Sequence, residues 1–234
     1  MHEHPPELAL VVPVYNEQEA IIAVLREWRE EFQRHSSNFL ILVINDGSSD
    51  GTAEKLATLD WPELQVLSHA NRGHGQSCLA GYIEAARQGA TYTFQIDSDG
   101  QCDPASFAKV WEQRRRAPAV YGRRVTRDDG WSRVLISRLL RWNLKLAQHT
   151  RLNDANVPFR LYHAQLATET AQRIPRSFDL ANIAMALLME PHGFIEVPIH
   201  FRDRTGGHPT VRWWGFARKA VRLRRDFKTL RHAG

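Results

Sequence analysis

Continuous apolar segments alternate with amphipathic ones over the first hundred residues of this 234-residue chain. Residues 8–14 and 39–44 are unbroken apolar runs rich in β-branched side chains, which is typical of strands buried on both faces. Residues 21–32 carry apolar side chains at helical spacing, and further helices are expected at about 53–59 and 77–88. Strands and helices in this alternation favour a mostly parallel sheet with helices on both faces. The sequence therefore predicts an α/β fold.

Polar loops follow the predicted strands at their carboxyl ends. The loops after the first, second and weak third strand (66–67) read Tyr15-Asn-Glu17, Asn45-Asp-Gly-Ser-Ser-Asp-Gly-Thr52 and Asn71-Arg-Gly-His-Gly-Gln-Ser77. Ligands of open α/β sheets bind outside the carboxyl ends of the strands. We therefore expect these loops to crowd one edge of the sheet and to hold a nucleotide there. Within the third loop, His74 and Gln76 are expected to be loop residues with no chemical role.

A fourth predicted strand, residues 92–96, delivers two carboxylates to its carboxyl end. Asp97 and Asp99 stand there, before Gly100 and the dipeptide Asp103-Pro104, which has the N-cap and N1 preferences of a helix start. Two neighbouring carboxylates repel each other unless they share a cation. Oxygen ligands of this kind suit Mg²⁺ or Mn²⁺ held together with substrate phosphates. The alternative is a polar turn with a helix cap, because Asp-x-Asp alone also recurs by chance.

The order of these motifs resembles family 2 glycosyltransferases of the GT-A fold, in particular the subgroup with dolichol-phosphate mannose synthase and bacterial polyprenyl-phosphate glycosyltransferases. The residues that carry the resemblance in the first half are Val12-Pro-Val-Tyr-Asn-Glu17, Asn45 to Thr52, Asn71-x-Gly73 and Asp97-Ser-Asp-Gly-Gln101. Later pieces agree, namely Gly122-Arg-Arg124, Asp154 with Pro158-Phe-Arg-Leu-Tyr162, Glu196-Val-Pro-Ile199, Arg204 and Gly206-Gly207. The resemblance thus covers about residues 8–207. Each motif is weak alone, and their order is what makes the resemblance specific.

The resemblance implies a role for each matching residue. The donor nucleotide would be bound by Pro13, Tyr15, Glu17, Asp46, Asp97 and Ser98, with Asp46 on the nucleobase. The metal that bridges the diphosphate would be held by Asp97, Asp99 and Gln101. Catalytic roles fall to Asp99, Asp154 and Arg204, and an acceptor phosphate would meet Arg124 and Arg133. Simpler alternatives are a turn cap for Asp46, packing at a strand end for Tyr15, and a structural ion pair with Arg160 for Asp154.

The acceptor decides which chemistry the chain must supply. A hydroxyl acceptor needs a general base, whereas a lipid phosphate is already ionised and needs cations to place it. Asp179 and Asn182 lie in the acceptor-side region, and Asn182 stands where the resembling enzymes often carry a carboxylate. Together with the arginines, this favours a phosphate acceptor. Against it, Gly207-His-Pro-Thr210 lacks the lysine that polyprenyl-phosphate enzymes usually show after Arg204.

Charge is concentrated in the C-terminal half, and the formal net charge is +5 with a pI near 9.5. Residues 211–231 place aromatic and aliphatic side chains in one helical stripe among arginines and lysines, and residues 131–147 repeat that pattern. A basic amphipathic helix of this kind is typical of one that lies on an anionic membrane surface. The alternative is an ordinary helix packed on the catalytic domain. We expect residues 1–207 to form the catalytic domain and 208–234 a basic amphipathic helix.

The sequence therefore predicts a metal-dependent inverting glycosyltransferase that uses a nucleoside diphosphate sugar and Mg²⁺ or Mn²⁺. Its expected acceptor is a polyprenyl phosphate or another lipid, and the alternative is a soluble glycan or a small-molecule hydroxyl. The chain has no run of eighteen apolar residues and no signal sequence, so we expect a cytoplasmic protein, at most peripheral on the membrane. A nucleic-acid-binding protein would explain the pI but not the acidic loops, so no nucleic acid partner is expected.

Overall fold

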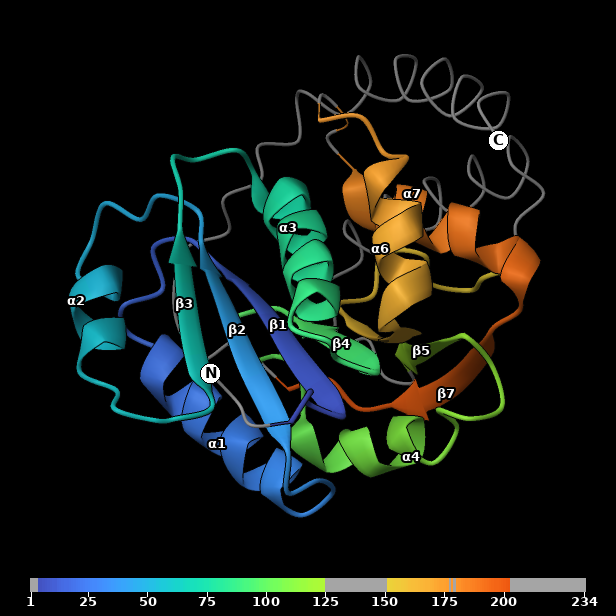
Figure 1. Cartoon of the computed structure of the whole chain (residues 1–234), viewed down its shortest axis with the longest axis horizontal. Coiled ribbons are helices and arrows are strands. Elements are labelled where there is room, and N and C mark those ends of the chain that lie inside the picture. The colour runs from blue at the N-terminus through green and yellow to red at the C-terminus, as the bar shows by residue number, and fades with distance from the viewer. Residues whose placement is uncertain (1–3, 125–150, 177, 179, 203–234) are drawn as a thin grey trace.

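A seven-stranded sheet forms the centre of the computed structural model, which describes residues 4–124, 151–176, 178 and 180–202 (Figure 1). The strand order is β3-β2-β1-β4-β6-β5-β7. Of the described strands, β6 alone runs antiparallel to its neighbours, and the other pairs are parallel. The strands are β1 (Leu8–Val14), β2 (Phe39–Asn45), β3 (Leu64–Ser68), β4 (Tyr92–Ile96), β5 (Ala119–Arg124), β6 (Phe159–His163) and β7 (Ile195–Ile199).

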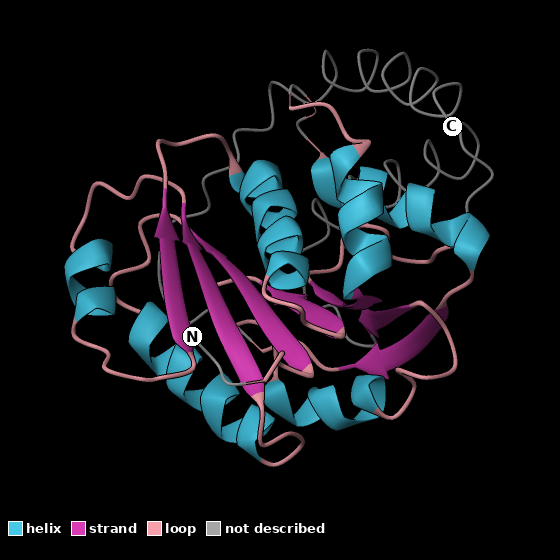
Figure 2. Ribbon diagram, in the orientation of Figure 1, coloured by secondary structure: helices cyan, strands magenta, loops and turns pink. Residues whose placement is uncertain are grey.

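Helices cover both faces of this sheet (Figures 1 and 2). One face carries α3 (His74–Arg87), α6 (Ala164–Gln172) and α7 (Ala181–Met189). The other carries α1 (Ile21–Gln33) and α4 (Phe107–Trp111), which follows the 3₁₀ turn η1 (Pro104–Ser106). The short helix α2 (Thr52–Ala57) lies beside α1, and the turn η2 (Glu190–His192) follows α7. The predicted mostly parallel α/β sheet with helices on both faces is confirmed.

The core explains why the predicted elements form where they do. Every position of β1 and β2 is buried, as their unbroken apolar sequences require. Trp28 of α1 packs on Phe94 of β4, Phe107 of α4 and Phe159 of β6, with ring centroids 5.4–6.1 Å apart. Successive residues of β4 alternate between its faces, as in any strand, so the face away from this cluster is left for α3. That alternation matters for the site described below.

The third predicted helix, α3, begins three residues earlier than residue 77. His74 and Gln76 are therefore helical and not loop residues, which corrects the sequence-based expectation. Gly73 precedes the helix with a φ of 91°, a conformation that side chains other than glycine rarely adopt. Sequence analysis missed this start because no serine, threonine or aspartate immediately precedes His74. The Asp46 carboxylate, which is distant in sequence, caps the turn instead.

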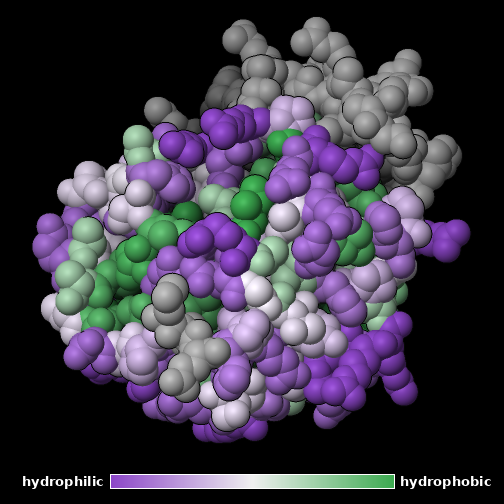
Figure 3. All heavy atoms as spheres, in the orientation of Figure 1, coloured by the Kyte–Doolittle hydropathy of each residue, from purple (hydrophilic) through white to green (hydrophobic). Residues whose placement is uncertain are grey.

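Figure 3 shows that the α3 face of the molecule is mostly polar, with apolar surface beside the edge strand β3, where Val66 is 37% exposed. No helix among the described residues is both long and apolar enough to cross a bilayer. Several expectations fall on residues outside the described ranges. They are the two basic amphipathic segments 131–147 and 211–231, the domain boundary at 207/208, and the residues Arg133, Asp179 and Arg204.

Candidate active site

The loops after β1 and β2 are joined to each other at the carboxyl ends of these strands. The Asn16 amide donates to Ser48 Oγ at 3.0 Å, and the Ser49 amide donates back to Asn16 Oδ1 at 2.8 Å. Asn16 has a φ of 55°, which asparagine tolerates better than most residues. The Glu17 amide donates to Thr52 Oγ1 at 3.0 Å, so the first turn of α2 is tied to the same loop. The loops after β1 and β2 are thus joined by hydrogen bonds at one edge of the sheet, where the sequence predicts a nucleotide site.

The residues predicted to line the nucleotide pocket lie along these joined loops. Pro13 pairs with Ile44 within the sheet, and Tyr15 follows β1 with 43% of its surface exposed. That exposure argues against simple packing at a strand end for Tyr15. Glu17 sits at the turn before α1, where its carbonyl accepts the Ile21 amide at 3.0 Å. The structure therefore gathers Pro13, Tyr15 and Glu17 at one edge.

Asp46 follows β2 and is almost completely buried, with 2% of its surface exposed. Its Oδ1 accepts the Arg72 amide at 2.7 Å, and its Oδ2 accepts the Gly73 amide at 2.9 Å. The carboxylate thereby caps the turn that leads into α3, so the turn-cap interpretation of Asp46 is correct. Each carboxylate oxygen accepts more than one hydrogen bond, so this role leaves a contact with a nucleobase possible.

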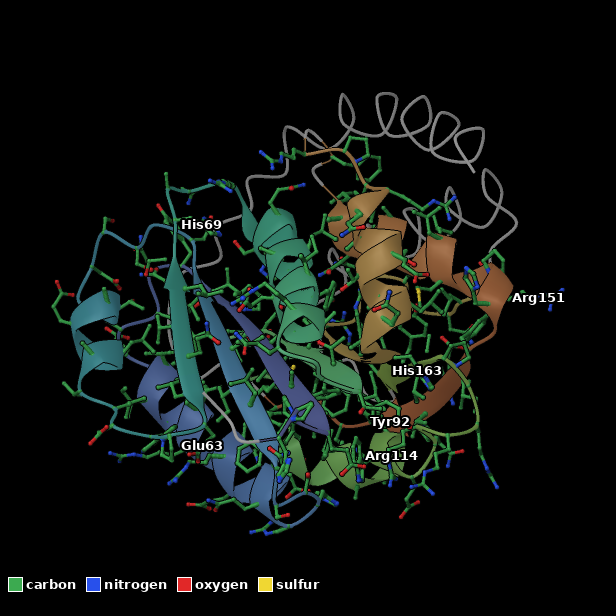
Figure 4. All side chains as sticks on the ribbon, viewed as in Figure 1. Glu63, His69, Tyr92, Arg114, Arg151 and His163 are labelled. Atoms are coloured by element: carbon green, nitrogen blue, oxygen red, sulfur yellow. The ribbon has the colours of Figure 1, made fainter. Side chains whose placement is uncertain are left out.

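His69 lies at the carboxyl end of β3 (Figure 4), and its side chain is beside Asp46. Its Nδ1 is 2.9 Å from the Ala70 carbonyl oxygen and 3.3 Å from Asp46 Oδ1. Both neighbours are acceptors, so this nitrogen carries the proton. Figure 4 also shows Tyr92, His163 and Arg114 away from His69, towards the opposite ends of the strands. Tyr92, His163 and Arg114 therefore lie outside the site at the carboxyl ends of β1 and β2.

The two carboxylates after β4 are held by different neighbours. Asp97 Oδ1 accepts a hydrogen bond from Gln95 Nε2 at 3.2 Å, and His74 Nε2 lies 3.3 Å from the same oxygen. Asp99 Oδ1 accepts the Gln101 amide at 3.1 Å. The side chain of Asp97 is 31% exposed, so solvent and a ligand can reach it. Ser98 between them is buried.

His74 opens α3 directly in front of Asp97, and about half of its side chain (49%) is exposed. Its Nε2 lies 3.5 Å from Cys78 Sγ, one helical turn along α3. Burial acts to lower the pKa of His74, but Cys78 and the Asp97 carboxylate outweigh this and raise it to about 10. The Asp97 carboxylate at 3.3 Å thus favours the protonated form of His74. Sequence analysis missed it, because a single histidine in a glycine-rich stretch carries no spacing signal.

The segment after β7 lies across the loop that carries these carboxylates. The Arg202 amide donates to the Gln101 carbonyl at 2.9 Å, and Phe201 forms an antiparallel bridge with Cys102. The Arg202 guanidinium donates to Asp103 Oδ1 at 2.7 Å and to Glu27 Oε2 of α1 at 2.6 Å. Asp103 also caps η1 by accepting the Ala105 amide at 3.2 Å, as its sequence context predicted. The loop from Asp97 to Asp103 is thus held by backbone contacts with Phe201 and Arg202 and by the ion pair between Arg202 and Asp103.

On the acceptor side, Asp154 pairs with Arg124 and not with Arg160. Arg124 Nε donates to Asp154 Oδ2 at 2.9 Å, and both side chains are about four-fifths buried. The proposed structural pairing of Asp154 with Arg160 is therefore wrong. Arg160 is fully buried and donates to the carbonyl oxygens of Val157, Asn182 and Ala155 at 2.5, 2.6 and 2.9 Å. Three carbonyls thus satisfy it without a carboxylate.

Asn182 starts α7 beside the first turn of α3. A Cβ added to Gly75 would come within 2.9 Å of Ala181 Cβ, so glycine is what allows the two helix starts to approach this closely. Asn182 Nδ2 lies 3.4 Å from His74 Nε2, which places the amide near Asp97. An amide cannot take a proton from an acceptor hydroxyl, so Asn182 is not a general base.

The donor set fits a divalent cation that arrives with a phosphate ligand. Mg²⁺ is held through one or two carboxylates and substrate phosphates, and Asp97 and Asp99 supply that number. Among the described residues, no group of three or more histidine, cysteine, aspartate or glutamate side chains gathers into a metal cage. This loop therefore suits a metal shared with a diphosphate.

Three solved structures are similar to this chain over most of its length. Mannosyl-3-phosphoglycerate synthase from Rubrobacter xylanophilus matches with a TM-score of 0.65 and 16% identity, covering 98% of this chain and 75% of that one. Glucosyl-3-phosphoglycerate synthase from Mycobacterium tuberculosis matches with a TM-score of 0.61 and 14% identity, covering 94% and 79%. S. aureus TarS 1–349 matches with a TM-score of 0.55 and 14% identity, covering 83% and 58%. At these identities the likeness shows the fold, and the narrower resemblance to polyprenyl-phosphate enzymes stays a prediction.

The family is shown by the sequence itself. The family model described as glycosyl transferase family 2 matches residues 9–169, which is more than half of the chain. The matched range contains both carboxylates after β4, Asp46 and the Arg124–Asp154 pair. The chain therefore belongs to glycosyl transferase family 2, and it is a glycosyltransferase with the GT-A fold.

Proposed function

We propose that this enzyme moves a sugar from a nucleoside diphosphate sugar, bound with Mg²⁺ or Mn²⁺, to a hydroxyl group of a small soluble acceptor. The observation that carries the proposal is the position of Asp97 and Asp99. They follow β4, which is adjacent to β1 in the sheet, and the loops after β1 and β2 are joined to each other beside them. This is the edge where open α/β sheets bind ligands. An acidic pair there suits a diphosphate only when a cation accompanies it.

The donor half of the site would work as follows. Pro13, Tyr15 and Glu17 line the pocket for base and ribose, and Asp46 holds the base while it also caps the turn before α3. Asp97 and Ser98 run along the ribose and diphosphate. Asp97, Asp99 and Gln101 would hold the metal, and the Gln101 backbone amide donates to Asp99 Oδ1 at 3.1 Å. A bound divalent cation would neutralise the charge that builds on the leaving nucleoside diphosphate.

Asp154 is our candidate for the general base that takes the proton from the acceptor hydroxyl. It lies before β6, on the other side of β4 from the nucleotide loops, and Arg124 fixes its orientation through Oδ2. Asn182 stands where the resembling enzymes often carry a carboxylate, and an amide cannot accept the proton, so we assign that role to Asp154. The family resemblance implies inversion at the anomeric carbon, in which the acceptor oxygen attacks from the face opposite the leaving group. Arg204 and Arg133 stay candidate phosphate contacts that lie outside the described residues.

The names of the similar structures support a soluble acceptor. Two of them are synthases whose names contain 3-phosphoglycerate, and one was crystallised with Mn²⁺, UDP-glucose and phosphoglyceric acid. These facts belong to those proteins, but their chains share the fold of this one over more than nine-tenths of its length. A small acceptor with a negative charge would also find Arg124 at the carboxyl end of β5.

A lipid phosphate is the second candidate acceptor, and the sequence of residues 211–231 is the observation that favours it. Its arginines and lysines flank an aromatic and aliphatic stripe, a pattern suited to an anionic membrane surface. Sedimentation with phosphatidylglycerol vesicles at low salt tests this directly. Binding that falls steeply as salt rises would support the lipid acceptor and a peripheral membrane location, and no sedimentation would remove both.

Two measurements test the proposed function in order. A thermal-shift screen of UDP-, GDP- and dTDP-sugars with Mn²⁺ identifies the donor, because a ligand that binds the folded state raises the melting temperature. Incubation with the radiolabelled donor, followed by extraction into organic solvent, then separates a lipid product from a soluble one. The configuration of the product by NMR decides inversion. A chain that none of these sugar nucleotides stabilises, with or without metal, would contradict the proposal.

A further inference from the structure

Gln95 is a polar side chain inside the core, in the middle of the predicted strand 92–96. It is fully buried on the α3 face of β4, whereas Phe94 on the opposite face belongs to the aromatic cluster around Trp28. Because successive strand residues alternate between faces, Gln95 and Asp97 project to the same side. A buried amide is costly unless both its oxygen and its nitrogen find partners. The hydrogen-bond partners of Gln95 therefore indicate its role.

The helix that covers this face of β4 is α3, and it places a line of polar side chains opposite Gln95 and Asp97. His74, Cys78 and Tyr82 are four residues apart, so they line one side of α3. The Tyr82 hydroxyl donates to Gln95 Oε1 at 3.3 Å, and Gln95 Nε2 donates to Asp97 Oδ1 at 3.2 Å. Burial raises the pKa of Tyr82 far above its usual value, so the hydroxyl keeps its proton and donates. The donor at one end and the carboxylate at the other fix which way the Gln95 amide points.

We propose that Tyr82 and Gln95 are positioning residues that hold the Asp97 carboxylate in the orientation in which it meets the donor diphosphate and its metal. The chain Tyr82–Gln95–Asp97 ends on Oδ1, and His74 meets that same oxygen at 3.3 Å. Both contacts fall on one oxygen, so they set the plane of the carboxylate. Apolar side chains would fill the α3–β4 interface without burying an amide, whereas a satisfied polar network specifies one geometry. The inference rests on the proposed function of Asp97.

The test compares two tyrosines that differ in this one contact. Tyr82 and Tyr121 are both fully buried, and both stack edge-on against Tyr162, with ring centroids 5.5 and 5.7 Å away. Among the described residues the Tyr121 hydroxyl lies near Tyr162 and makes no hydrogen bond to Gln95, whose oxygen accepts from Tyr82 instead. Tyr82→Phe and Tyr121→Phe therefore each remove one buried hydroxyl from the same aromatic group. Only Tyr82→Phe breaks the chain to Asp97.

The readout is Mn²⁺ binding by the full-length protein in the presence of saturating UDP, GDP or dTDP, measured by titration calorimetry. Tyr82→Phe is expected to weaken the apparent Mn²⁺ affinity by about threefold to tenfold, the usual effect of one hydrogen bond. Tyr121→Phe is expected to change it by less than about twofold. Nucleoside diphosphate binding in EDTA should change less than Mn²⁺ binding does, because the loops after β1 and β2 are untouched and a carboxylate does not attract a diphosphate without a cation.

Gln95→Met adds a second variant, which keeps the volume and removes both hydrogen bonds. It is expected to weaken Mn²⁺ binding more than Tyr82→Phe does. Equal Mn²⁺ affinity in Tyr82→Phe and Tyr121→Phe would overturn the positioning role while leaving the glycosyltransferase function in place. If the wild type binds Mn²⁺ no better with any of the three nucleotides than without, the proposed donor site itself is wrong, and the positioning role is overturned with it.

Discussion

Arg124 Nε donates to Asp154 Oδ2 at 2.9 Å, which joins the end of β5 to the turn that precedes β6. The guanidinium also lies over the ring of Phe201, 4.8 Å from its centroid, next to the bridge between Phe201 and Cys102. Asp154 on the acceptor side and the carboxylate loop on the donor side are thus connected through two side chains. A carboxylate held in this way does not need to search for its orientation, which suits the proposed role of Asp154 as the general base.

The first prediction tests the role of Asp154. Asp154→Asn keeps the shape and one acceptor for Arg124 but cannot take a proton, so transfer should fall by about 10²–10⁴-fold. Donor affinity, measured by thermal shift with the sugar nucleotide, should stay the same. A variant that melts several degrees earlier yet transfers sugar at the normal rate would show that Asp154 is structural. Arg124→Gln serves as the companion variant, because it breaks the pair without removing the carboxylate.

The second prediction concerns the metal. Asp99→Asn should abolish metal-dependent transfer, and wild-type activity should vanish in EDTA and return with Mg²⁺ or Mn²⁺, because in the proposed function the two carboxylates and the diphosphate share one cation. The Asp103→Asn variant is the comparison, since Asp103 belongs to the same loop but caps η1 and pairs with Arg202: it should keep metal-dependent transfer and at most raise the Mn²⁺ requirement, as Arg202→Gln does. Full turnover in chelator would exclude the metal role of Asp97, Asp99 and Gln101 together.

Asp46 gives the third prediction, in which stability and binding change together. Asp46→Ala leaves the amides of Arg72 and Gly73 without their acceptor in a buried turn, which should cost about 1–3 kcal/mol of the free energy of unfolding. Donor affinity should also drop, by about 1.5–3 kcal/mol for a hydrogen bond to a charged group. Urea denaturation and nucleotide titration measure the two losses separately. Reduced stability with unchanged donor affinity would leave Asp46 as a turn cap alone.

The fourth prediction is a pH dependence carried by Asp50, in the loop after β2. Burial acts to raise the pKa of Asp50, but hydrogen bonds from the Thr52 side chain and amide and from the Gln18 amide outweigh this and lower it. A carboxylate with a depressed folded-state pKa stabilises the fold above its unfolded pKa of 3.8 and loses that contribution as the pH falls through the folded value.

We therefore compare the wild type with Asp50→Asn by chemical denaturation from about pH 2 to pH 7, a range that spans both ionisation states. The wild type should be the more stable protein at neutral pH, and the difference should shrink below about pH 4. A difference that stays constant down to the lowest pH would mean that the charge of the Asp50 carboxylate does not contribute to stability.

Much of the fold could be read from the sequence, because its strongest signals are local. Residues 8–14 and 92–96 are predicted as strands, and β1 and β4 have those same bounds. Residues 8–14 are an unbroken apolar run, which needs burial on both faces. The start of α3 at His74 was missed because its cap, Asp46, lies 27 residues before Gly73. A capping contact between distant residues leaves no pattern in a single sequence.

The candidate site shows the same contrast between local sequence motifs, which could be predicted, and contacts between distant residues, which could not. Asp97, Asp99 and Asp46 could be named from motifs, because loops at the ends of parallel strands must meet. The residues that contact these carboxylates could not be named, because those contacts depend on which helix packs against which strand. His74 meets Asp97 only because α3 packs on that side of β4, and Arg124 reaches Asp154 only because β5 lies beside β6. The predicted partner, Arg160, points instead into the core, where three carbonyls surround it.

The last prediction tests whether the segment after β7 supports the carboxylate loop. Arg202→Gln removes the guanidinium that links Asp103 to Glu27, and each such partly exposed ion pair contributes only about 0.2–1 kcal/mol to stability. The loop between Asp99 and Asp103 should nevertheless lose one of its fixed ends. We expect the Mn²⁺ concentration for half-maximal activity to rise about threefold to tenfold, as for the loss of one or two hydrogen bonds, with little change in the maximal rate.

Arg87→Gln is the matched control for this experiment. Arg87 makes an equally close ion pair with Glu84, at 2.6 Å, but on the exposed surface of α3 and away from the loop. Both substitutions remove one arginine from a surface ion pair, so their effects on unfolding should be similar. Only Arg202→Gln should change the metal requirement, because only the Arg202 guanidinium contacts Asp103 in the carboxylate loop. An unchanged Mn²⁺ requirement in Arg202→Gln would mean that the loop keeps its shape without this side chain, and that its backbone contacts with Phe201 and Arg202 are sufficient.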